Sequence, residues 1–199
     1  MRIFFTLILA CWTLFAQAQP QKLLILGDSL SAGYGMTQQQ GWVHLLQQQL
    51  QQDKSGWQLI NASISGETTK GGLARLPELL KTHQPDAVLI ELGGNDGLRG
   101  FPLTELEKNL TAMLSLVKQH QARAILMQIR IPPNYGPRYT RQFVDLYPQL
   151  AEKHQVQYWP FFMDQIATKP ELMLSDGIHP NEKAQPIIRD FIAPMLLKL

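Results

Sequence analysis

Five short runs of apolar residues recur along the chain, and each is rich in leucine, isoleucine, valine or aromatic residues. Near-continuous apolar runs are typical of strands that are covered on both faces of a parallel sheet. We therefore expect strands at residues 22–26, 57–61, 87–92, 124–129 and 156–159. All five runs fall within the usual length of a strand.

The segments between these runs have a different period. Apolar residues recur there every three or four positions, which is the spacing of one face of a helix. The stripes comprise Trp42, Leu46 and Leu50; Leu73, Leu76, Leu79 and Leu80; Leu106, Leu110, Met113, Leu114 and Val117; and Phe143, Leu146 and Leu150. A last helix is expected from about Asn181 onward, disturbed at Pro186 and Pro194. The alternation of strands and helices predicts a three-layer α/β/α sandwich with a parallel sheet.

The composition fits a single domain and argues against nucleic acid as a partner. The chain has 199 residues, of which 45% are hydrophobic, and this is enough for one sizeable core. Its formal net charge is +2, and the sequence contains no block of lysine and arginine residues. A protein that tracks phosphate groups would normally carry such a block. We expect a monomer that acts on small molecules.

The N-terminal segment has the features of a secretory signal peptide. A basic start, Met1-Arg2, precedes an almost entirely apolar stretch at residues 3–15, and Ala16-Gln17-Ala18 matches the small-x-small cleavage pattern. Cleavage after Ala18 would leave one domain, residues 19–199, which we expect in the periplasm. It would also remove the only cysteine, so the mature protein would contain no disulfide.

Two other interpretations of this segment stay open. One is a membrane anchor, although the apolar run is shorter than the ~20 residues that a membrane-spanning helix needs. The other is lipidation of Cys11 after Ile8-Leu9-Ala10, although Leu9 fits that pattern poorly. We expect no stable membrane anchor.

Polar loops that contain glycine follow the first three predicted strands. Residues 27–29 read G-D-S, residues 61–68 read N-A-S-I-S-G-E-T, and residues 93–97 read G-G-N-D-G. A fourth such loop, D-G-I-H-P at residues 176–180, precedes the last helix. Ligands of open parallel sheets bind beyond the carboxyl ends of the strands. The four loops are therefore expected to converge on one rim and to carry the functional residues.

Two of these loops contain the residue types of nucleophilic catalysis. Asp176 and His179 are three residues apart, so that the carboxylate could hold the imidazole Nδ1–H and leave Nε2 free as a base. Ser29 could supply a hydroxyl nucleophile. A serine in a strand–helix turn and a surface turn with an incidental histidine are the simpler interpretations. A metal site that joins Asp28 or Asp96 to this pair is another alternative, although clustered histidine or cysteine ligands are lacking.

Gly66 and Asn95 are candidate donors to an oxyanion. A developing negative charge needs N–H groups aimed at it. Gly66 could offer its backbone N–H without a Cβ in the way, and Asn95 could offer its side-chain amide. A turn glycine and a helix-capping asparagine are the ordinary interpretations of these residues. The serine motif differs from G-x-S-x-G, because Asp28 directly precedes Ser29.

The four motifs together resemble those of the SGNH (GDSL) hydrolases. G-D-S-L (residues 27–30), the glycine of N-A-S-I-S-G-E-T, G-G-N-D (residues 93–96) and D-G-I-H-P occur in the family's order along nearly all of residues 19–199. The resemblance implies a flavodoxin-like sandwich with about five parallel strands. It also implies that Ser29 is the nucleophile, His179 the base and Asp176 its orienting partner. The Ser29 N–H, the Gly66 N–H and the Asn95 amide would form the oxyanion hole, and no metal or organic cofactor would be needed.

Two apolar loops after the third and fourth predicted strands could form the walls of a groove for an acyl chain. The candidate substrate-binding residues are Leu98, Arg99, Phe101 and Pro102 in the first loop and Ile131 and Tyr135 in the second. Ordinary loop packing would explain these residues equally well. Glycines in the first loop would permit a lid-like movement.

These features predict a serine esterase and thioesterase that acts through an acyl-enzyme. The family resemblance implies acyl-CoA thioesters, lysophospholipids and simple aryl or alkyl esters as substrates. A carbohydrate or small-ester deacetylase of the same fold is the alternative among enzymes, and the apolar loops argue against it. A fatty-acid-binding protein without turnover is the alternative outside enzymes, and the complete set of catalytic positions argues against it.

Overall fold

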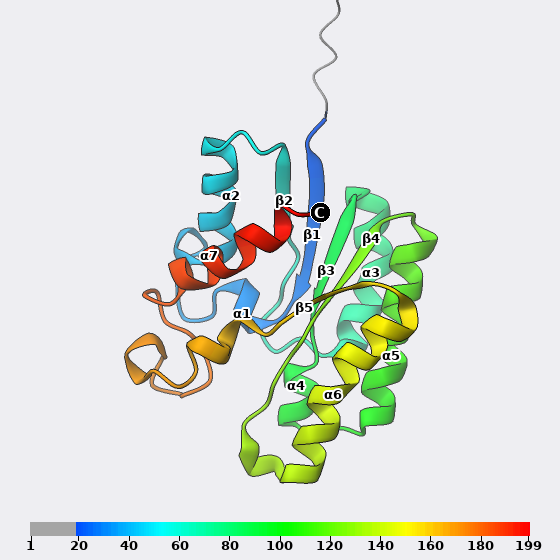
Figure 1. Ribbon diagram of the computed structural model, residues 1–199, viewed down its shortest axis with the longest axis vertical. Coiled ribbons are helices and arrows are strands. Elements are labelled where there is room, and N and C mark those ends of the chain that lie inside the picture. Colours follow the sequence, from blue (N-terminus) through cyan, green and yellow to red (C-terminus); the bar gives the residue numbers. More distant parts are fainter. Residues whose placement is uncertain (1–18) are drawn as a thin grey trace, which may run out of the picture.

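A five-stranded parallel sheet forms the centre of the molecule (Figure 1). The computed structural model describes residues 19–199, so the predicted signal peptide and Cys11 lie outside the described residues. The strands are β1 (Gln21–Gly27), β2 (Trp57–Asn61), β3 (Ala87–Glu91), β4 (Arg123–Met127) and β5 (Gln157–Trp159). Their order in the sheet is β2-β1-β3-β4-β5, and every neighbouring pair is parallel. The predicted strands are confirmed, with small differences at their ends.

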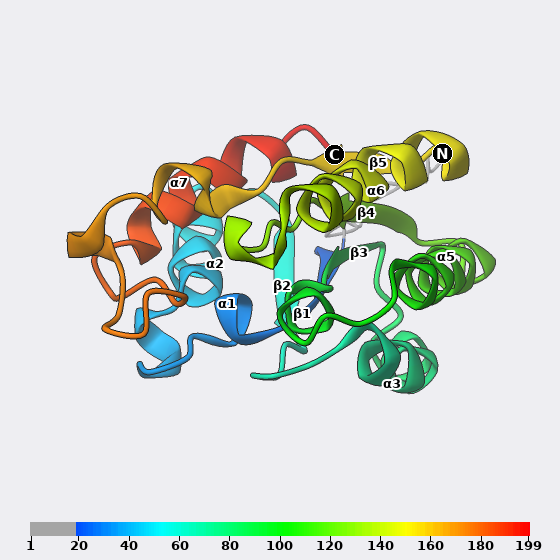
Figure 2. The same ribbon diagram turned by 90° about the horizontal axis from the view of Figure 1, so that it is seen from below.

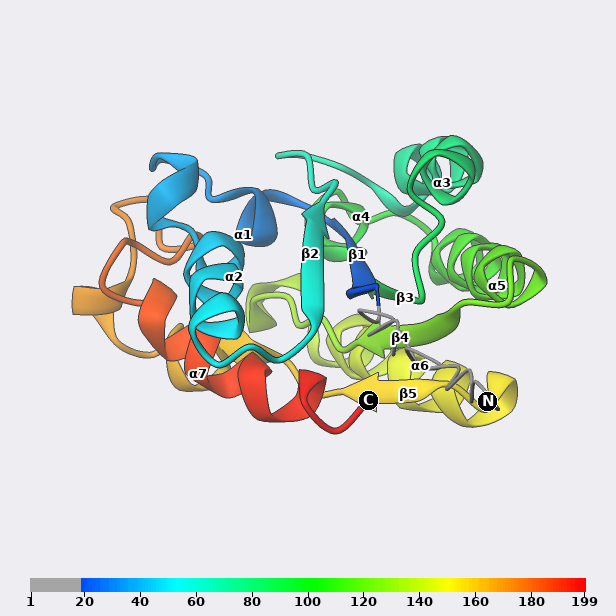
Figure 3. The same ribbon diagram turned by 90° about the horizontal axis from the view of Figure 1, so that it is seen from above.

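Helices cover both faces of the sheet, and the predicted three-layer α/β/α architecture is confirmed. They are α1 (Ser29–Ala32), α2 (Trp42–Gln52), α3 (Thr69–His83), α4 (Gly94–Leu98), α5 (Leu103–Gln119), α6 (Pro137–His154) and α7 (Gln185–Leu196). Short 3₁₀ turns occupy Gln38–Gln40, Pro133–Tyr135, Phe162–Gln165 and Pro170–Leu172. Figures 2 and 3 show α2 and α7 together on one side of the sheet and α3 and α5 on the other, with α6 packed beside α5. None of the helices in residues 19–199 is long and apolar enough to cross a membrane.

Burial of the sheet on both faces explains why its strands are almost continuously apolar. Residues 23–26 of β1 and residues 87–90 of β3 have no exposed surface. The helices contribute their predicted apolar stripes to the same core, and Trp42 and Phe143 are among its largest fully buried side chains. Removal of this apolar surface from water, at about 25 cal/mol per Å², is the main favourable contribution to folding.

The last helix begins later than the expected position near Asn181. Turns span residues 181–184, and α7 begins at Gln185. Pro186 lies in the first turn, where its missing N–H would have no partner in any case, so it starts the helix and does not disturb it. Pro194 lies inside the helix, which nevertheless continues to Leu196. The buried Gln185 side chain accepts a hydrogen bond from the Trp42 N–H at 3.0 Å and thereby joins α7 to α2.

The carboxyl ends of the strands meet at one rim of the molecule. In Figure 1, β1 runs downward, and α1 and α4 begin near its lower end; Figure 2 looks onto this rim. In the register of the sheet, Gly27 at the end of β1 is paired with Glu91 at the end of β3. The chain segments that follow β1 and β3 therefore begin side by side.

The turn after β3 depends on a glycine. Gly93 has a φ of +120°, and a Cβ added to it would lie 2.1 Å from the Tyr147 hydroxyl oxygen. Tyr147 is fully buried, and its hydroxyl donates to the Leu92 carbonyl at 3.0 Å. The tyrosine thus occupies the space that a side chain at position 93 would need, and it holds the turn that leads into α4.

We expect Gly93→Ala to lower the free energy of unfolding by about 2–6 kcal/mol, because backbone strain and overpacking each cost ~1–3 kcal/mol. In a Tyr147→Phe background the same substitution should cost less, because the clashing oxygen is gone. Urea denaturation of the four proteins of this cycle measures the difference. Gly100→Ala is the control for strain alone, since Gly100 has a φ of +65° and an open space around the added Cβ. Equal costs of Gly93→Ala in the two backgrounds would contradict the steric explanation.

Candidate active site

Ser29 lies where β1 ends and the short helix α1 begins. Asp28 caps this helix, because its Oδ1 accepts a hydrogen bond from the Leu30 N–H at 3.1 Å. Asp28 is only 3% exposed and Ser29 only 9%. The hydrogen bond from the Leu30 N–H to the Asp28 side chain therefore bridges Ser29 and fixes the backbone on both sides of it.

The loop before α7 carries Asp176 and His179. Asp176 Oδ1 accepts hydrogen bonds from the backbone N–H groups of Ile178 at 2.9 Å and His179 at 3.0 Å. Asp176 Oδ2 lies 2.7 Å from His179 Nδ1, and His179 Nε2 lies 2.8 Å from Ser29 Oγ. The structure thus joins three predicted site residues from distant parts of the chain in one series of hydrogen bonds.

The surroundings of Asp176 keep its carboxylate ionised. Its slight burial opposes ionisation, but hydrogen bonds from the His179 backbone, the His179 ring and the Ile178 backbone lower the pKa of Asp176 to about 2. An ionised carboxylate can only accept, so Nδ1 carries the proton in its contact with Asp176. Nε2 of the neutral ring is then an acceptor that can take the proton of Ser29 Oγ.

Asp28 also holds Asn95, the predicted oxyanion donor of α4. Asn95 Nδ2 donates to Asp28 Oδ2 at 3.2 Å, and the second hydrogen of this amide stays available for an oxyanion. The next residue, Asp96, is buried and accepts hydrogen bonds from the Thr69 N–H at 2.9 Å and the Thr69 hydroxyl at 2.5 Å. Asp28 therefore positions Asn95, and Asp96 anchors α4 to α3.

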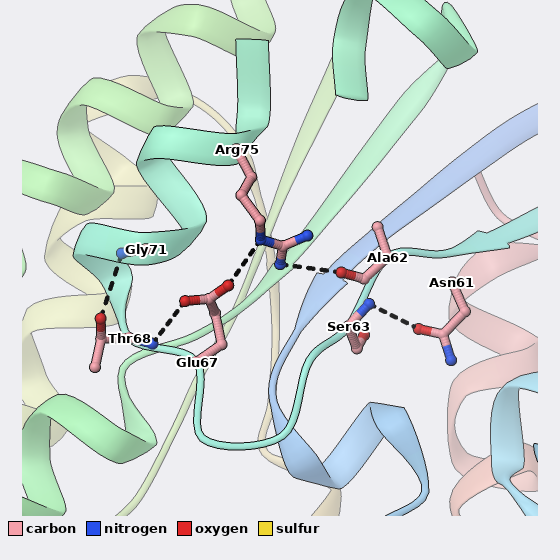
Figure 4. A network of polar contacts seen from close by, with 7 residues as sticks. All are labelled: Asn61, Ala62, Ser63, Glu67, Thr68, Gly71 and Arg75. Atoms are coloured by element: carbon pink, nitrogen blue, oxygen red, sulfur yellow. Dashed lines mark hydrogen bonds and ion pairs between the residues drawn. The ribbon is translucent and has the colours of Figure 1, made fainter. Parts of the chain in front are cut away.

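The loop that carries Gly66 is braced by an arginine of α3 (Figure 4). Arg75 donates to Glu67 at 2.8 Å and to the Ala62 carbonyl at 3.1 Å, so one guanidinium ties both ends of the loop. Arg99 donates to the Gly66 carbonyl at 3.3 Å and links the loop to the end of α4. Gly66 itself has a φ of +81°, which favours glycine. These contacts hold the Gly66 loop beside the segment that carries Asn95.

A second buried acid lies beside the start of α1. Glu91 is completely buried, and its Oε2 accepts hydrogen bonds from Ser31 Oγ at 2.7 Å and the Asp28 N–H at 3.4 Å. Its Oε1 has no hydrogen-bond partner among residues 19–199. Burial, together with the nearby Asp28, raises the pKa of Glu91 well above its ordinary value, and burial raises the pKa of Asp28 to about 6. Burial thus favours the protonated form of Glu91, whereas Asp28, with a pKa of about 6, is mostly ionised at neutral pH.

Two hydrogen bonds hold the segment that carries Leu98 and Phe101, one from the second predicted loop and one from α6. Tyr135 Oη donates to the Leu98 carbonyl at 2.8 Å. Tyr139 Oη donates to the Phe101 carbonyl at 2.8 Å, and the Phe101 side chain is among the exposed large apolar ones. Leu98 thus lies beside the second loop, and Phe101 lies beside the start of α6. Their contact with an acyl chain stays a prediction.

Three other predicted substrate contacts have local structural roles. Ile131 is buried, and its methyl group occupies the space where a Cβ on Gly97 would lie. Pro102 precedes α5 at its N-terminal cap, and Arg99 supports the Gly66 loop. Contact of these residues with a substrate stays a prediction.

The structure does not group the residues of the metal alternative. Asp28 is engaged by Leu30 and Asn95, and Asp96 is engaged by Thr69. In the part of the chain that the structure describes, no three histidine, cysteine, aspartate or glutamate side chains are placed to hold a metal ion.

Three contacts of the site are not evident from the sequence patterns. The sequence patterns present Asp28 as the residue before the serine and as a possible metal ligand, whereas in the structure it caps α1 and holds Asn95. Glu91 directly follows four buried apolar residues, and a carboxyl group at the end of a buried strand is a signal of a partner or a bound proton. Tyr34, whose ring packs on His179, has no local signal, because its contact lies far along the chain.

Comparison with known proteins identifies the family. The model of the GDSL-like lipase/acylhydrolase family matches residues 25–186. This chain belongs to that family. Among its relatives, an arylesterase of Vibrio mimicus is 54% identical over 188 residues, which are 94% of each chain. The thioesterase 1/protease 1/lysophospholipase L1 of Escherichia coli strain K12 is 52% identical over 185 residues, which are 93% of this chain and 88% of that protein.

Solved structures of esterases have the same fold. The psychrotrophic esterase EstA from Pseudoalteromonas sp., in a structure inhibited by monoethylphosphonate, is 50% identical and superposes with a TM-score of 0.88 over 89% of this chain and 97% of that chain. TesA is 44% identical, with a TM-score of 0.85 over 88% of this chain and 98% of that chain. The SGNH hydrolase fold is thus confirmed, and the GDSL family to which the chain belongs is a family of serine hydrolases.

We expect Asp28→Asn to gain stability relative to the wild type as the pH rises. The pKa of Asp28 in the folded protein, about 6, lies above the ~3.9 of an unfolded chain. The aspartate therefore contributes stability below about pH 4, and this contribution is lost as the pH rises through about 6. Asparagine does not titrate, so the difference in unfolding free energy should shift in favour of the variant by on the order of 2 kcal/mol between about pH 4 and pH 7.

Urea denaturation of both proteins at the two pH values measures this shift. Asp53→Asn, at the exposed C-terminal end of α2, is the control for removal of a surface carboxylate. A difference between Asp28→Asn and the wild type that does not change with pH would contradict the assigned burial effect.

Proposed function

We propose that this protein is a serine esterase and thioesterase that hydrolyses acyl esters and thioesters through an acyl-enzyme. The observation that carries the proposal is the series of hydrogen bonds from Ser29 Oγ to His179 Nε2 at 2.8 Å and from His179 Nδ1 to Asp176 at 2.7 Å. It occurs in a member of the GDSL-like lipase/acylhydrolase family. A serine beside a base and oxyanion donors is the arrangement that acyl transfer requires.

In the first half-reaction, His179 acts as the base. Ser29 Oγ attacks the carbonyl carbon of the substrate, and the hydroxyl proton passes to His179 Nε2. Asp176 stays ionised and stabilises the imidazolium. The N–H groups of Ser29 and Gly66 and the Asn95 amide donate to the oxyanion of the tetrahedral intermediate. The bond to the leaving alcohol or thiol then breaks, and His179 returns its proton to the leaving group.

The second half-reaction repeats these steps with water. His179 takes a proton from the water, which attacks the acyl-serine and forms a second tetrahedral intermediate. The ester bond to Ser29 breaks, its oxygen takes the proton from His179, and the fatty acid leaves. Every proton in this scheme moves through His179, so the scheme uses no metal or organic cofactor.

We infer that the substrates are aryl and alkyl esters, acyl-CoA thioesters and lysophospholipids. The names of the relatives support this range, because one is an arylesterase and another a thioesterase and lysophospholipase. In this chain, Leu98 and Phe101 offer apolar surface close behind Asn95 for the acyl chain. Ile131 and Tyr135 would complete the wall of the groove through their contacts with that loop.

We propose that the protein is exported to the periplasm and acts there as a monomer. The composition of residues 1–18 supports cleavage after Ala18. One chain supplies every group of the proposed mechanism, which supports a monomer. N-terminal sequencing and light scattering of protein from a periplasmic extract should show a monomer that begins at Gln19, and a chain that retains Met1 would contradict the proposed export.

Hydrolysis of p-nitrophenyl esters from acetyl to palmitoyl tests the catalytic proposal. We expect Ser29→Ala to lower kcat by about 10⁴-fold or more, because it removes the nucleophile. Ser115→Ala is the control, since the hydroxyl of Ser115 bonds only to the backbone of its own helix, α5. A fluorophosphonate probe should label Ser29 in the wild-type protein and nothing in Ser29→Ala.

The chain-length profile distinguishes the alternatives. A preference for medium or long acyl chains supports the apolar groove, whereas activity confined to acetyl esters and acetylated sugars would favour a deacetylase. A wild-type protein that binds fatty acid but hydrolyses no ester would be a carrier, and the catalytic proposal would be wrong.

A further inference from the structure

The aromatic ring of Tyr34 lies against the imidazole of His179. The two ring centroids are 4.2 Å apart and the ring planes are inclined by 31°, which is close to a stacked arrangement. Tyr34 is nevertheless 47% exposed, so it is a surface residue and not part of the core. Burial in the core therefore does not account for the contact of Tyr34 with His179.

The backbone holds Tyr34 in this position. Its N–H donates to the Ser29 carbonyl at 3.2 Å, which ties the tyrosine to the residue that carries the hydroxyl. The next residue, Gly35, lies so close to Leu174 that an added Cβ would be 2.9 Å from Leu174 Cδ1. The Leu174 N–H in turn donates to the His179 carbonyl at 2.8 Å. The turn that carries Tyr34 is thus seated between Ser29 and the loop that carries His179.

The two hydrogen bonds of the imidazole do not fix its orientation by themselves. They hold Nδ1 at Asp176 and Nε2 at Ser29, and small rotations about the Cα–Cβ and Cβ–Cγ bonds of His179 still allow the ring to rock. Rocking turns the Nε2 lone pair away from Ser29 Oγ and weakens the hydrogen bond through which the proton moves. A flat group packed on one face of the ring opposes this motion, and Tyr34 is such a group.

An aromatic face also favours one protonation state of the histidine. A cation within about 6 Å of a ring centroid is attracted by the π-electrons of its face, whereas a neutral ring gains less. In the proposed mechanism the imidazolium exists only after Ser29 has given up its proton. The charged groups that face His179 are Asp176 in its own loop and Asp28 at the start of α1. Both carboxylates face the histidine in the resting enzyme as well as in the tetrahedral intermediate.

We propose that Tyr34 is a positioning residue for His179, which keeps the imidazole aligned with Ser29 and stabilises its protonated form. The proposal rests on the proposed role of His179 as the base. Tyr34 acts through the face of its ring, so phenylalanine at this position should be equivalent, and leucine should cover the imidazole without supplying a π face.

Tyr34→Leu and Tyr34→Phe test this role with p-nitrophenyl butyrate as substrate. We expect Tyr34→Leu to lower kcat by about 10-fold and to leave KM within about 2-fold of the wild type, because a misaligned base slows the chemical step. The acid limb of its kcat/KM profile should move to lower pH by about half a unit, since the imidazolium loses a favourable contact. Tyr34→Phe should stay within about 2-fold of the wild type in kcat and keep the wild-type acid limb.

Tyr158→Leu is the matched control, because Tyr158 lies on β5 and is 37% exposed. It should leave kcat and the pH profile unchanged, and urea denaturation verifies that every variant is folded. A wild-type kcat and an unmoved acid limb in Tyr34→Leu would overturn the proposal. An equal loss in Tyr34→Phe would overturn it as well, because the hydroxyl and not the ring would then be responsible.

A measurement without turnover separates this proposal from the proposed function. In proton NMR spectra, the His179 ring protons of the wild type should show a ring-current shift that persists in Tyr34→Phe and disappears in Tyr34→Leu. Absence of this shift in the wild type would contradict the stacked contact. Full activity of Ser29→Ala would overturn the catalytic proposal and the role of Tyr34 together. An inactive Ser29→Ala beside a fully active Tyr34→Leu would overturn the role of Tyr34 alone.

Discussion

One buried carboxylate sets the geometry on which the rest of the site depends. Asp28 uses one oxygen to cap the helix that begins with Ser29 and the other to hold the amide of Asn95. A carboxylate can accept from two donors on different elements, and burial strengthens both bonds because water does not compete for them. The serine and the amide across from it are therefore positioned by the same side chain. The raised pKa of Asp28 shows the energetic cost of holding a charge at this place.

The order of the strands explains why the two groups face each other. From β1 the chain passes to β2 on one side and then returns across β1 to β3 on the other side. At such a change of direction, the loops that follow the two central strands turn toward opposite faces of the sheet and leave a crevice between them. The segment after β1 leads to α2, and the segment after β3 leads to α5 on the opposite face (Figure 2). Asp28 and Asn95 meet across this crevice.

Features with a local signal could be predicted from the sequence. Buried strands appear as apolar runs, and the shared edge of a parallel sheet brings the loops of Ser29 and Asn95 together whatever their detailed path. The start of α7 could not be predicted, because a proline such as Pro186 is compatible with both the beginning and the interruption of a helix. The contact of Tyr34 with His179 could not be predicted either, since it depends on how two long loops fold against each other.

Asp176 and His179 form a unit that is complete within one loop. Asp176 takes its hydrogen bonds from the backbone of Ile178 and from the backbone and ring of His179. If this loop moved away from α1, the carboxylate and the imidazole would travel together, and among the three side chains only the bond between His179 and Ser29 would break. No buried ion would be stripped of its partner, so separation would carry little of the penalty of breaking a buried ion pair. The assembled site thus consists of two parts that can form independently. One is Ser29 with its oxyanion donors, and the other is the pair of Asp176 and His179. A single uncharged hydrogen bond, between His179 and Ser29, joins these side chains, together with the packing around it.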